Sequence, residues 1–143
     1  MWVRDEIRSA VEREGVCAAE LCDDEVRMLE ASVEHAFAEP GPAPLWERLR
    51  FSHGFYDPEG WRRVGAFSSD AANLLVRDGH GVCAFRFASS QDIPRVLAEC
   101  SGFEFYVCDE MRSYLLAFNH HDFLIGAGTA AHWLGSLPDP PRP

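Results

Sequence analysis

Four consecutive polar residues, Asn119-His120-His121-Asp122, form the one cluster in this sequence whose side chains could do chemistry. A histidine held by a carboxylate can take or give a proton near neutral pH, so Asp122 could orient His120 or His121. Asn119 could then hold a substrate oxygen. These side chains include types that also bind zinc. Catalysis, metal binding and a structural role are therefore the three hypotheses for this cluster.

Metal binding would require side chains from other parts of the chain. Neighbouring residues of an extended chain point to opposite faces, so His120 and His121 converge on one ion only if a turn redirects them. Further ligands would have to come from distant residues such as His53, Asp57 or His80.

The sequence lacks the motifs of well-known catalytic sites. It contains no Gly-x-Ser-x-Gly and no His-x-x-x-His pair with a glutamate. Gly126 and Gly128 precede a predicted helix without the third glycine and the lysine of phosphate-binding loops. We therefore expect no catalytic residue, no metal and no cofactor. The alternative is a small hydrolase or metal-dependent enzyme, with catalytic residues Asn119, His120, His121 and Asp122 and metal ligands His121 and Asp122.

The structural hypothesis places the cluster at the tip of a β-hairpin. Short apolar runs flank it, 115–118 before and 123–125 after, and such runs are typical of strands. Asn and Asp suit a turn because their side chains bond nearby backbone groups. We expect this tip to belong to a partner-binding surface, together with a tyrosine, a residue type enriched in interface hot spots. The expected binding residues are His120, His121, Asp122 and Tyr56.

The apolar pattern predicts helices and strands in a segregated order. Helical spacing predicts helices over 2–14, 24–38, 90–100 and 129–137. Strands are predicted over 73–77 and 82–87, joined as a hairpin by the Asp-Gly turn at 78–81. A further strand over 104–109 is predicted to form a three-stranded meander with the two strands around the Asn-His-His-Asp cluster. This order predicts an α+β fold with a mainly antiparallel sheet of about five strands, helices on one face and an N-terminal helical pair.

The chain of 143 residues has the length of one domain. We expect a single α+β domain over 1–137, made of a helical arm, 1–39, and a sheet-containing body, 45–137. Alternate prolines between them favour an extended connector. The proline-rich end, 138–143, is expected to be disordered.

Charge and hydropathy exclude some classes of partner. The sequence has 23 acidic and 13 basic residues, a net charge of −10. Such a balance repels the phosphate backbone, so we expect no nucleic-acid partner. No apolar run approaches the ~18 residues that span a bilayer, and the N-terminus lacks an apolar signal core. We therefore expect a soluble, cytoplasmic protein without a membrane partner; the oligomeric state stays open.

The five cysteines are odd in number and irregularly spaced, which argues against a disulfide framework. Cys83, Cys100 and Cys108 lie in apolar segments, so we expect them to be buried thiols that pack as small hydrophobes.

The C-terminal third resembles a known signature. Residues 114–128 read Tyr-Leu-Leu-Ala-Phe-Asn-His-His-Asp-Phe-Leu-Ile-Gly-Ala-Gly, and Trp133-Leu134 follow. This stretch resembles the end of a small uncharacterised bacterial family, in which an Asn-His-His-Asp hairpin leads into Leu-Ile-Gly-x-Gly and a helix carrying Trp-Leu. The similarity is looser upstream, through Trp46 and Trp61. The resemblance implies a shared fold in a stand-alone cytosolic protein, and some members resemble toxin-immunity partners.

These observations favour a non-enzymatic, cytoplasmic protein-binding module of the immunity or antitoxin kind. Its acidic surface would steer a basic, toxin-like protein partner, and apolar anchors would hold it. An enzyme centred on the Asn-His-His-Asp cluster is the alternative.

Overall fold

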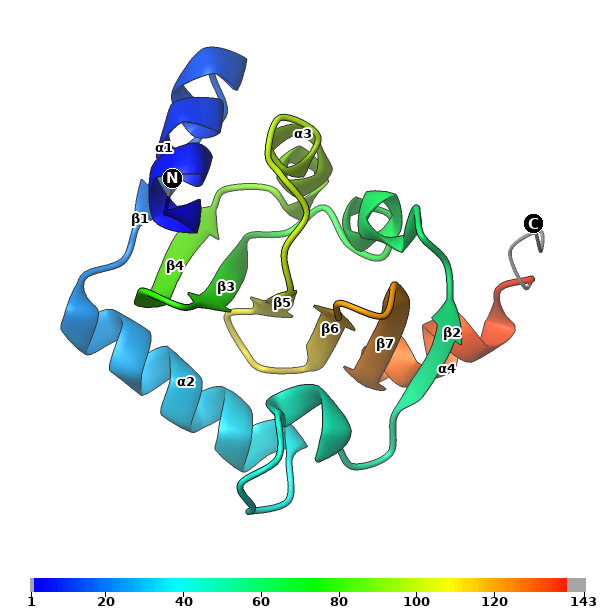
Figure 1. Cartoon of the computed structure of the whole chain (residues 1–143). Coiled ribbons are helices and arrows are strands. Elements are labelled where there is room, and N and C mark those ends of the chain that lie inside the picture. The colour runs from blue at the N-terminus through cyan, green and yellow to red at the C-terminus, as the bar shows by residue number, and fades with distance from the viewer. Residues whose placement is uncertain (1, 139–143) are drawn as a thin grey trace.

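The computed structural model describes residues 2–138, which form one seven-stranded sheet with helices packed against both of its faces (Figure 1). The expected disordered end lies, apart from Pro138, outside the described residues. The helices are α1 (Val3–Glu14), α2 (Asp23–Phe37), α3 (Ile93–Leu97) and α4 (Thr129–Ser136), with 3-10 helices η1 (Leu45–Glu47), η2 (Gly60–Gly65) and η3 (Ser90–Asp92). The strands are β1 (Ala18–Glu20), β2 (His53–Tyr56), β3 (Ala72–Asp78), β4 (Gly81–Phe87), β5 (Phe105–Asp109), β6 (Tyr114–Phe118) and β7 (Phe123–Gly128).

The strands lie in the order β1-β4-β3-β5-β6-β7-β2, and every pairing among the described strands is antiparallel. The α+β class is therefore confirmed, as are the β3–β4 hairpin and the β5–β6–β7 meander. The strand number of about five is wrong, because the sheet also contains β1 and β2 at its two edges. Both are short strands whose partners, β4 and β7, are distant in sequence.

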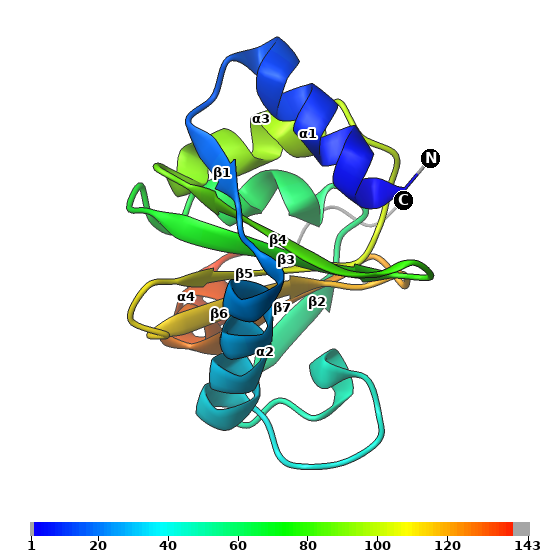
Figure 2. The ribbon, with the colours of Figure 1, turned by 90° about the vertical axis from the view of Figure 1, so that its left-hand side faces the viewer.

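The prediction that helices cover one face is also wrong. One face carries α1, α3, η2 and α4, whose apolar side chains pack on the largest core cluster. The opposite face carries α2, which buries Val26, Leu29 and Val33 against Leu75 and Leu115. Figure 2 shows α1 and α3 on one side of the sheet and α2 on the other. The first two helices thus do not form a pair, because β1 lies between them and joins the sheet edge.

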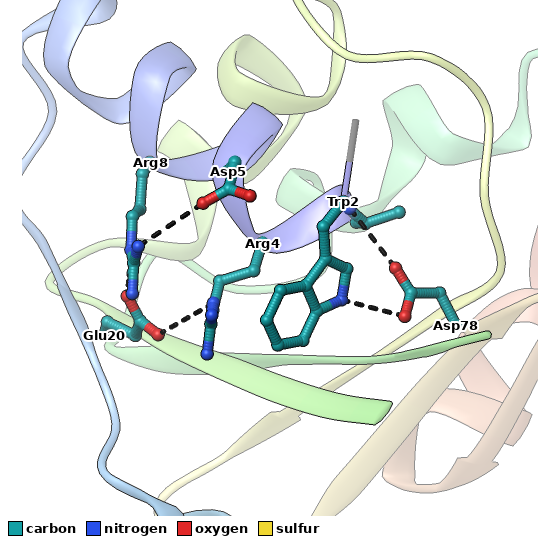
Figure 3. Close-up of polar contacts among 7 residues, drawn as sticks. Trp2, Arg4, Asp5, Arg8, Glu20 and Asp78 are labelled. Atoms are coloured by element: carbon teal, nitrogen blue, oxygen red, sulfur yellow. Dashed lines mark hydrogen bonds and ion pairs between the residues drawn. The ribbon is translucent and has the colours of Figure 1, made fainter. Parts of the chain in front are cut away.

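Polar contacts tie α1 to the sheet at the β3–β4 turn (Figure 3). Asp78 accepts hydrogen bonds from the Trp2 indole Nε1, at 2.8 Å, and from the Val3 backbone N–H, at 3.2 Å. The guanidinium of Arg4 stacks 3.5 Å from the centre of the Trp2 ring. Arg8 donates to Glu20 of β1 at 2.5 Å. The carboxylate of Asp78 therefore bonds N–H donors at the N-terminal end of α1, where intrahelical acceptors are missing.

Backbone contacts connect the end of α2 to the segment that precedes β2. Ala38 forms an isolated antiparallel bridge with Leu49, and the Arg50 N–H donates to the Phe37 carbonyl at 2.8 Å. The Arg48 side chain fastens the intervening loop through bonds to Ala43, Glu39 and Glu34. The proline-containing connector is therefore a fixed loop on the α2 face.

No helix of residues 2–138 combines the length and the apolar character that crossing a bilayer requires.

Candidate functional site

The Asn-His-His-Asp cluster does form the tip of the β6–β7 hairpin. The Asp122 N–H donates to the Asn119 carbonyl at 3.1 Å and closes the turn, and Asp122 has a left-handed φ of 62°. The side-chain oxygen of Asn119, a buried residue, accepts from the backbone N–H groups of His121, at 3.0 Å, and Phe123, at 3.1 Å. This amide therefore fixes the turn, and its oxygen is occupied by backbone donors.

The two imidazoles lie side by side on the outside of the turn, with ring centres 3.9 Å apart. His120 Nδ1 lies 2.5 Å from Glu104 Oε2, and the His120 backbone N–H donates to the same oxygen at 2.8 Å. Trp46 of η1 presents its ring to both histidines, with centre distances of 6.0 and 5.8 Å. Glu104, rather than Asp122, is thus the carboxylate that orients His120.

The other predicted binding residue, Tyr56, lies on the edge strand next to the hairpin. Its ring meets the Phe123 ring edge-on, with centres 6.0 Å apart. The Asp57 N–H donates to the Asp122 carbonyl at 2.9 Å, which extends the β2–β7 ladder to the turn. Tyr56 and the hairpin tip therefore lie at the same end of the β2–β7 pair.

The distant side chains considered as metal ligands do not gather at this tip. Asp57 is buried and binds Arg63 at 2.9 Å, and its other oxygen accepts from the Glu59 N–H. His80 lies beside Trp2. Gly135 of α4 comes close to the ring of His53. Residues 2–138 contain no group of three or more His, Cys, Asp or Glu side chains arranged to hold a metal ion.

A cavity of about 470 Å³ lies on the α2 face of the sheet. Its floor is made by strand residues, one wall by α2 and the other by the loop before η1. The lining residues are Glu30, Glu34, Gly41, Pro42, Ala43, Pro44, Leu45, Arg48, Leu75, Arg77, Val82, Glu104 and Tyr106. Its size lies within the usual range for small-molecule sites.

Most charged groups of this cavity are already paired. Arg48 forms a two-pronged contact with Glu34, at 2.7 and 2.8 Å, and its guanidinium lowers the pKa of the Glu34 carboxyl. Arg77 donates to Glu30 at 2.6 Å. Burial raises the pKa of Tyr106 to about 12, so its hydroxyl is neutral at physiological pH. Glu104 connects the cavity to the hairpin, since it lines the first and binds His120 of the second.

A second feature is the exposure of Phe51, a residue that is 93% accessible to solvent. Phe51 has a left-handed φ of 50°, which is rare for a bulky residue, and it precedes the edge strand β2 by two positions. Sequence reasoning missed both Phe51 and the cavity. The polar, aromatic and turn-rich stretch 52–60, which follows Phe51, was a signal for an unusual segment. The cavity had no such signal, because its walls come from segments far apart in sequence.

Of the three thiols predicted to be buried, Cys83 and Cys108 are buried, whereas Cys100 is only half-buried. Burial raises the pKa of Cys83 and Cys100 to about 11 and that of Cys108 to about 12. These thiols therefore stay protonated at neutral pH and lack the thiolate that a nucleophile needs.

A scan against protein-family models finds no matching family, and searches of curated proteins and of solved structures find no match.

Proposed function

We propose that this protein is a non-enzymatic binding module of the immunity or antitoxin kind, which occludes a basic protein partner. The observation that carries the proposal is the solvent-exposed, left-handed Phe51 beside the open edge of β2. The immunity or antitoxin part of the proposal comes from the resemblance expected for the C-terminal third, to a family with toxin-immunity-like members.

The backbone at Phe51 is fixed by the contacts of the preceding residue, Arg50, with the end of α2. The Arg50 N–H bonds to Phe37, and the Arg50 guanidinium bonds to the His35 carbonyl at 2.9 Å. Backbone strain in a non-glycine residue persists only where the surrounding structure enforces it, and it is concentrated at functional sites. An exposed aromatic ring on a fixed backbone loses little conformational entropy on binding, which suits an interface anchor.

The edge strand next to Phe51 has backbone groups that form no hydrogen bond with other residues of the range 2–138. Asp57 bonds inward to Asp122, and bonded and non-bonded pairs alternate along an antiparallel ladder. Gly54 and Tyr56 therefore direct their backbone N–H and C=O groups away from β7. A partner strand could add to this edge, with Phe51 and Tyr56 as flanking anchors.

The charge distribution favours a basic partner. Every arginine of residues 2–138 except Arg112 forms an ion pair with a carboxylate. Arg112 instead bonds to the Ser32 hydroxyl and the Glu110 carbonyl. The surplus of carboxylates leaves the chain at −10, a charge that attracts basic proteins and repels second copies of this chain at long range.

Site-specific photocrosslinking in host cells tests this proposal. The photoreactive p-benzoylphenylalanine replaces Phe51 in one variant and Met111 in a matched control, since Met111 is also highly exposed, at 85%, but lies in the β5–β6 turn. We expect a basic protein to crosslink at position 51 and not at 111. Crosslinks of equal yield at both positions, or none at 51, contradict the proposal.

A second candidate function, a small hydrolase or metal-dependent enzyme, is supported by one contact. His120 and Glu104 form a histidine–carboxylate pair of the kind that transfers protons. Chromogenic ester and phosphate substrates test it, with and without added divalent metal. A rate that the wild type has and His120→Gln lacks supports the enzyme; a wild-type rate equal to buffer argues against it.

A further inference from the structure

We infer that the cavity between α2 and the loop before η1 binds a small ligand with a guanidinium or ammonium group on an apolar stem. This inference does not depend on the proposed partner, because the cavity lies on the α2 face and Phe51 does not line it.

The apolar stem has a defined place in the cavity. Leu75 of β3 and Tyr106 of β5 form the floor, and Val82 lies beside them. Leu45 and the prolines Pro42 and Pro44 line the opposite wall. A cavity of about 470 Å³ with this lining can bury a short alkyl chain and exclude water from it.

The cavity favours a cationic ligand because its lining has more free hydrogen-bond acceptors on carboxylates than free donors on arginines. Among residues 2–138, Glu104 has no arginine partner, and only its Oε2 accepts hydrogen bonds, both from His120. Glu104 Oε1 accepts none from the described residues. Within the described part of the chain, the Glu30 carboxylate likewise accepts through Oε2 alone, from Arg77. Both carboxylates belong to residues that line the cavity, and each keeps one oxygen able to accept from a charged donor. Hydrogen bonds between charged groups are stronger than neutral ones.

An anionic ligand finds fewer partners in the same cavity. The Arg48 guanidinium already binds both Glu34 oxygens and the carbonyls of Ala43 and Glu39. Arg77 is bonded to Glu30. The lining therefore contains three carboxylates and two arginines, and both arginines are engaged.

Calorimetric titration of the full chain with butylguanidinium and with neutral butylurea, which has the same shape, tests the inference. We expect butylguanidinium to bind at least tenfold more tightly than butylurea. Glu104→Gln should remove that preference, whereas Glu12→Gln should retain it. Glu12 is exposed on α1, on the other face of the sheet, and its substitution changes the net charge equally.

Amide chemical shifts of the wild type provide a second measurement that does not require a variant to fold. Titration with butylguanidinium should move the signals of Leu45, Leu75 and Tyr106. A capped Gly-Arg-Gly peptide separates two sources of the cation: equal affinity assigns the cavity to an arginine side chain of a protein, and weaker affinity assigns it to a free small molecule. Equal binding of butylurea, unchanged binding by Glu104→Gln, or unmoved signals at these amides would overturn the inference.

Discussion

At the scale of single residues, Phe51 combines two unfavourable features that the chain retains. A left-handed backbone costs an L-residue roughly 1–2 kcal/mol, and a phenylalanine left in water forgoes roughly 1.5–3 kcal/mol of burial. Because the residue is 93% exposed, Phe51 gains little of this burial energy from contacts within the described chain. A partner that covers the ring would supply the free energy of burying it, and for this reason Phe51 supports a binding role.

A prediction concerns Asp78, which receives the hydrogen bonds at the start of α1. Burial raises the pKa of the Asp78 carboxyl, but the N–H groups of His80, Val3 and Trp2 outweigh it and lower the pKa overall. A lowered folded-state pKa stabilises the fold above the unfolded pKa of about 3.9 and loses that effect as pH falls through the folded value. Urea unfolding should therefore show Asp78→Asn less stable than the wild type at pH 7.

The pH series supplies the control for this prediction. The difference between wild type and Asp78→Asn should shrink as the pH falls from 5 through the lowered folded-state pKa of Asp78, because the wild-type carboxyl then becomes protonated. Trp2→Phe removes one of the hydrogen-bond donors to Asp78. In that background, the stability difference that Asp78→Asn causes should be smaller but still present. A difference that is constant from pH 7 to 3 rules out the charged form of Asp78 as the cause.

A second residue-scale prediction concerns Asn119. Its side-chain oxygen accepts from two backbone N–H groups in a buried position, and Asn119→Ala leaves both without a partner. We expect a loss of about 1–3 kcal/mol in the free energy of unfolding, measured by urea denaturation. Gln91→Ala, at an exposed position, should change stability by less than about 0.5 kcal/mol. Equal losses in both variants contradict a special role for the Asn119 amide.

At the scale of elements, local patterns predicted the parts of the fold that depend on neighbouring sequence. The β3–β4 hairpin follows from apolar runs joined by an Asp-Gly turn, and the β6–β7 hairpin from runs around Asn119 and Asp122. The strand β2 could not be predicted in the same way. Only its pairing with β7, far along the chain, makes His53–Tyr56 a strand.

The candidate site was predicted only in part, for the same physical reason. The turn position of His120 and His121 follows from sequence, but the orienting carboxylate, Glu104, precedes β5 and meets His120 only when β5 and β6 pair. The cavity likewise needs α2 and the loop before η1 on one face of the sheet. Periodicity shows which side of a helix is apolar, but it does not show which sheet face that side covers.

An element-scale prediction concerns the packing of α4 on β7. A Cβ atom at Gly126 would lie 2.8 Å from both the Ala130 carbonyl oxygen and Leu134 Cδ1. Gly126→Ala should therefore force α4 away from the sheet and lower the free energy of unfolding by roughly 1–3 kcal/mol. Gly102→Ala is the matched control, because nothing lies within 4 Å of the added atom. Thermal unfolding that shifts equally in the two variants would falsify this account of the α4–β7 contact.

At the scale of the whole molecule, the sheet divides the surface into regions with different properties. The α2 face holds the cavity, and the opposite face is covered by α1, α3, η2 and α4. The strand β2 forms one edge of the sheet (Figure 1). Edge strands are usually protected against pairing with other chains. Here the edge is flanked by Phe51 and Tyr56, on a chain of net charge −10 that repels its own copies.

The most direct test of the binding role is the dissociation constant of the protein crosslinked at position 51, measured for wild type, Phe51→Ser and Met111→Ser. Truncation of a central aromatic anchor typically costs 2 kcal/mol or more, a loss of roughly thirtyfold in affinity. We predict that loss for Phe51→Ser, unchanged affinity for Met111→Ser, and weaker wild-type binding as salt is raised. Affinity that is the same for Phe51→Ser and the wild type contradicts the account.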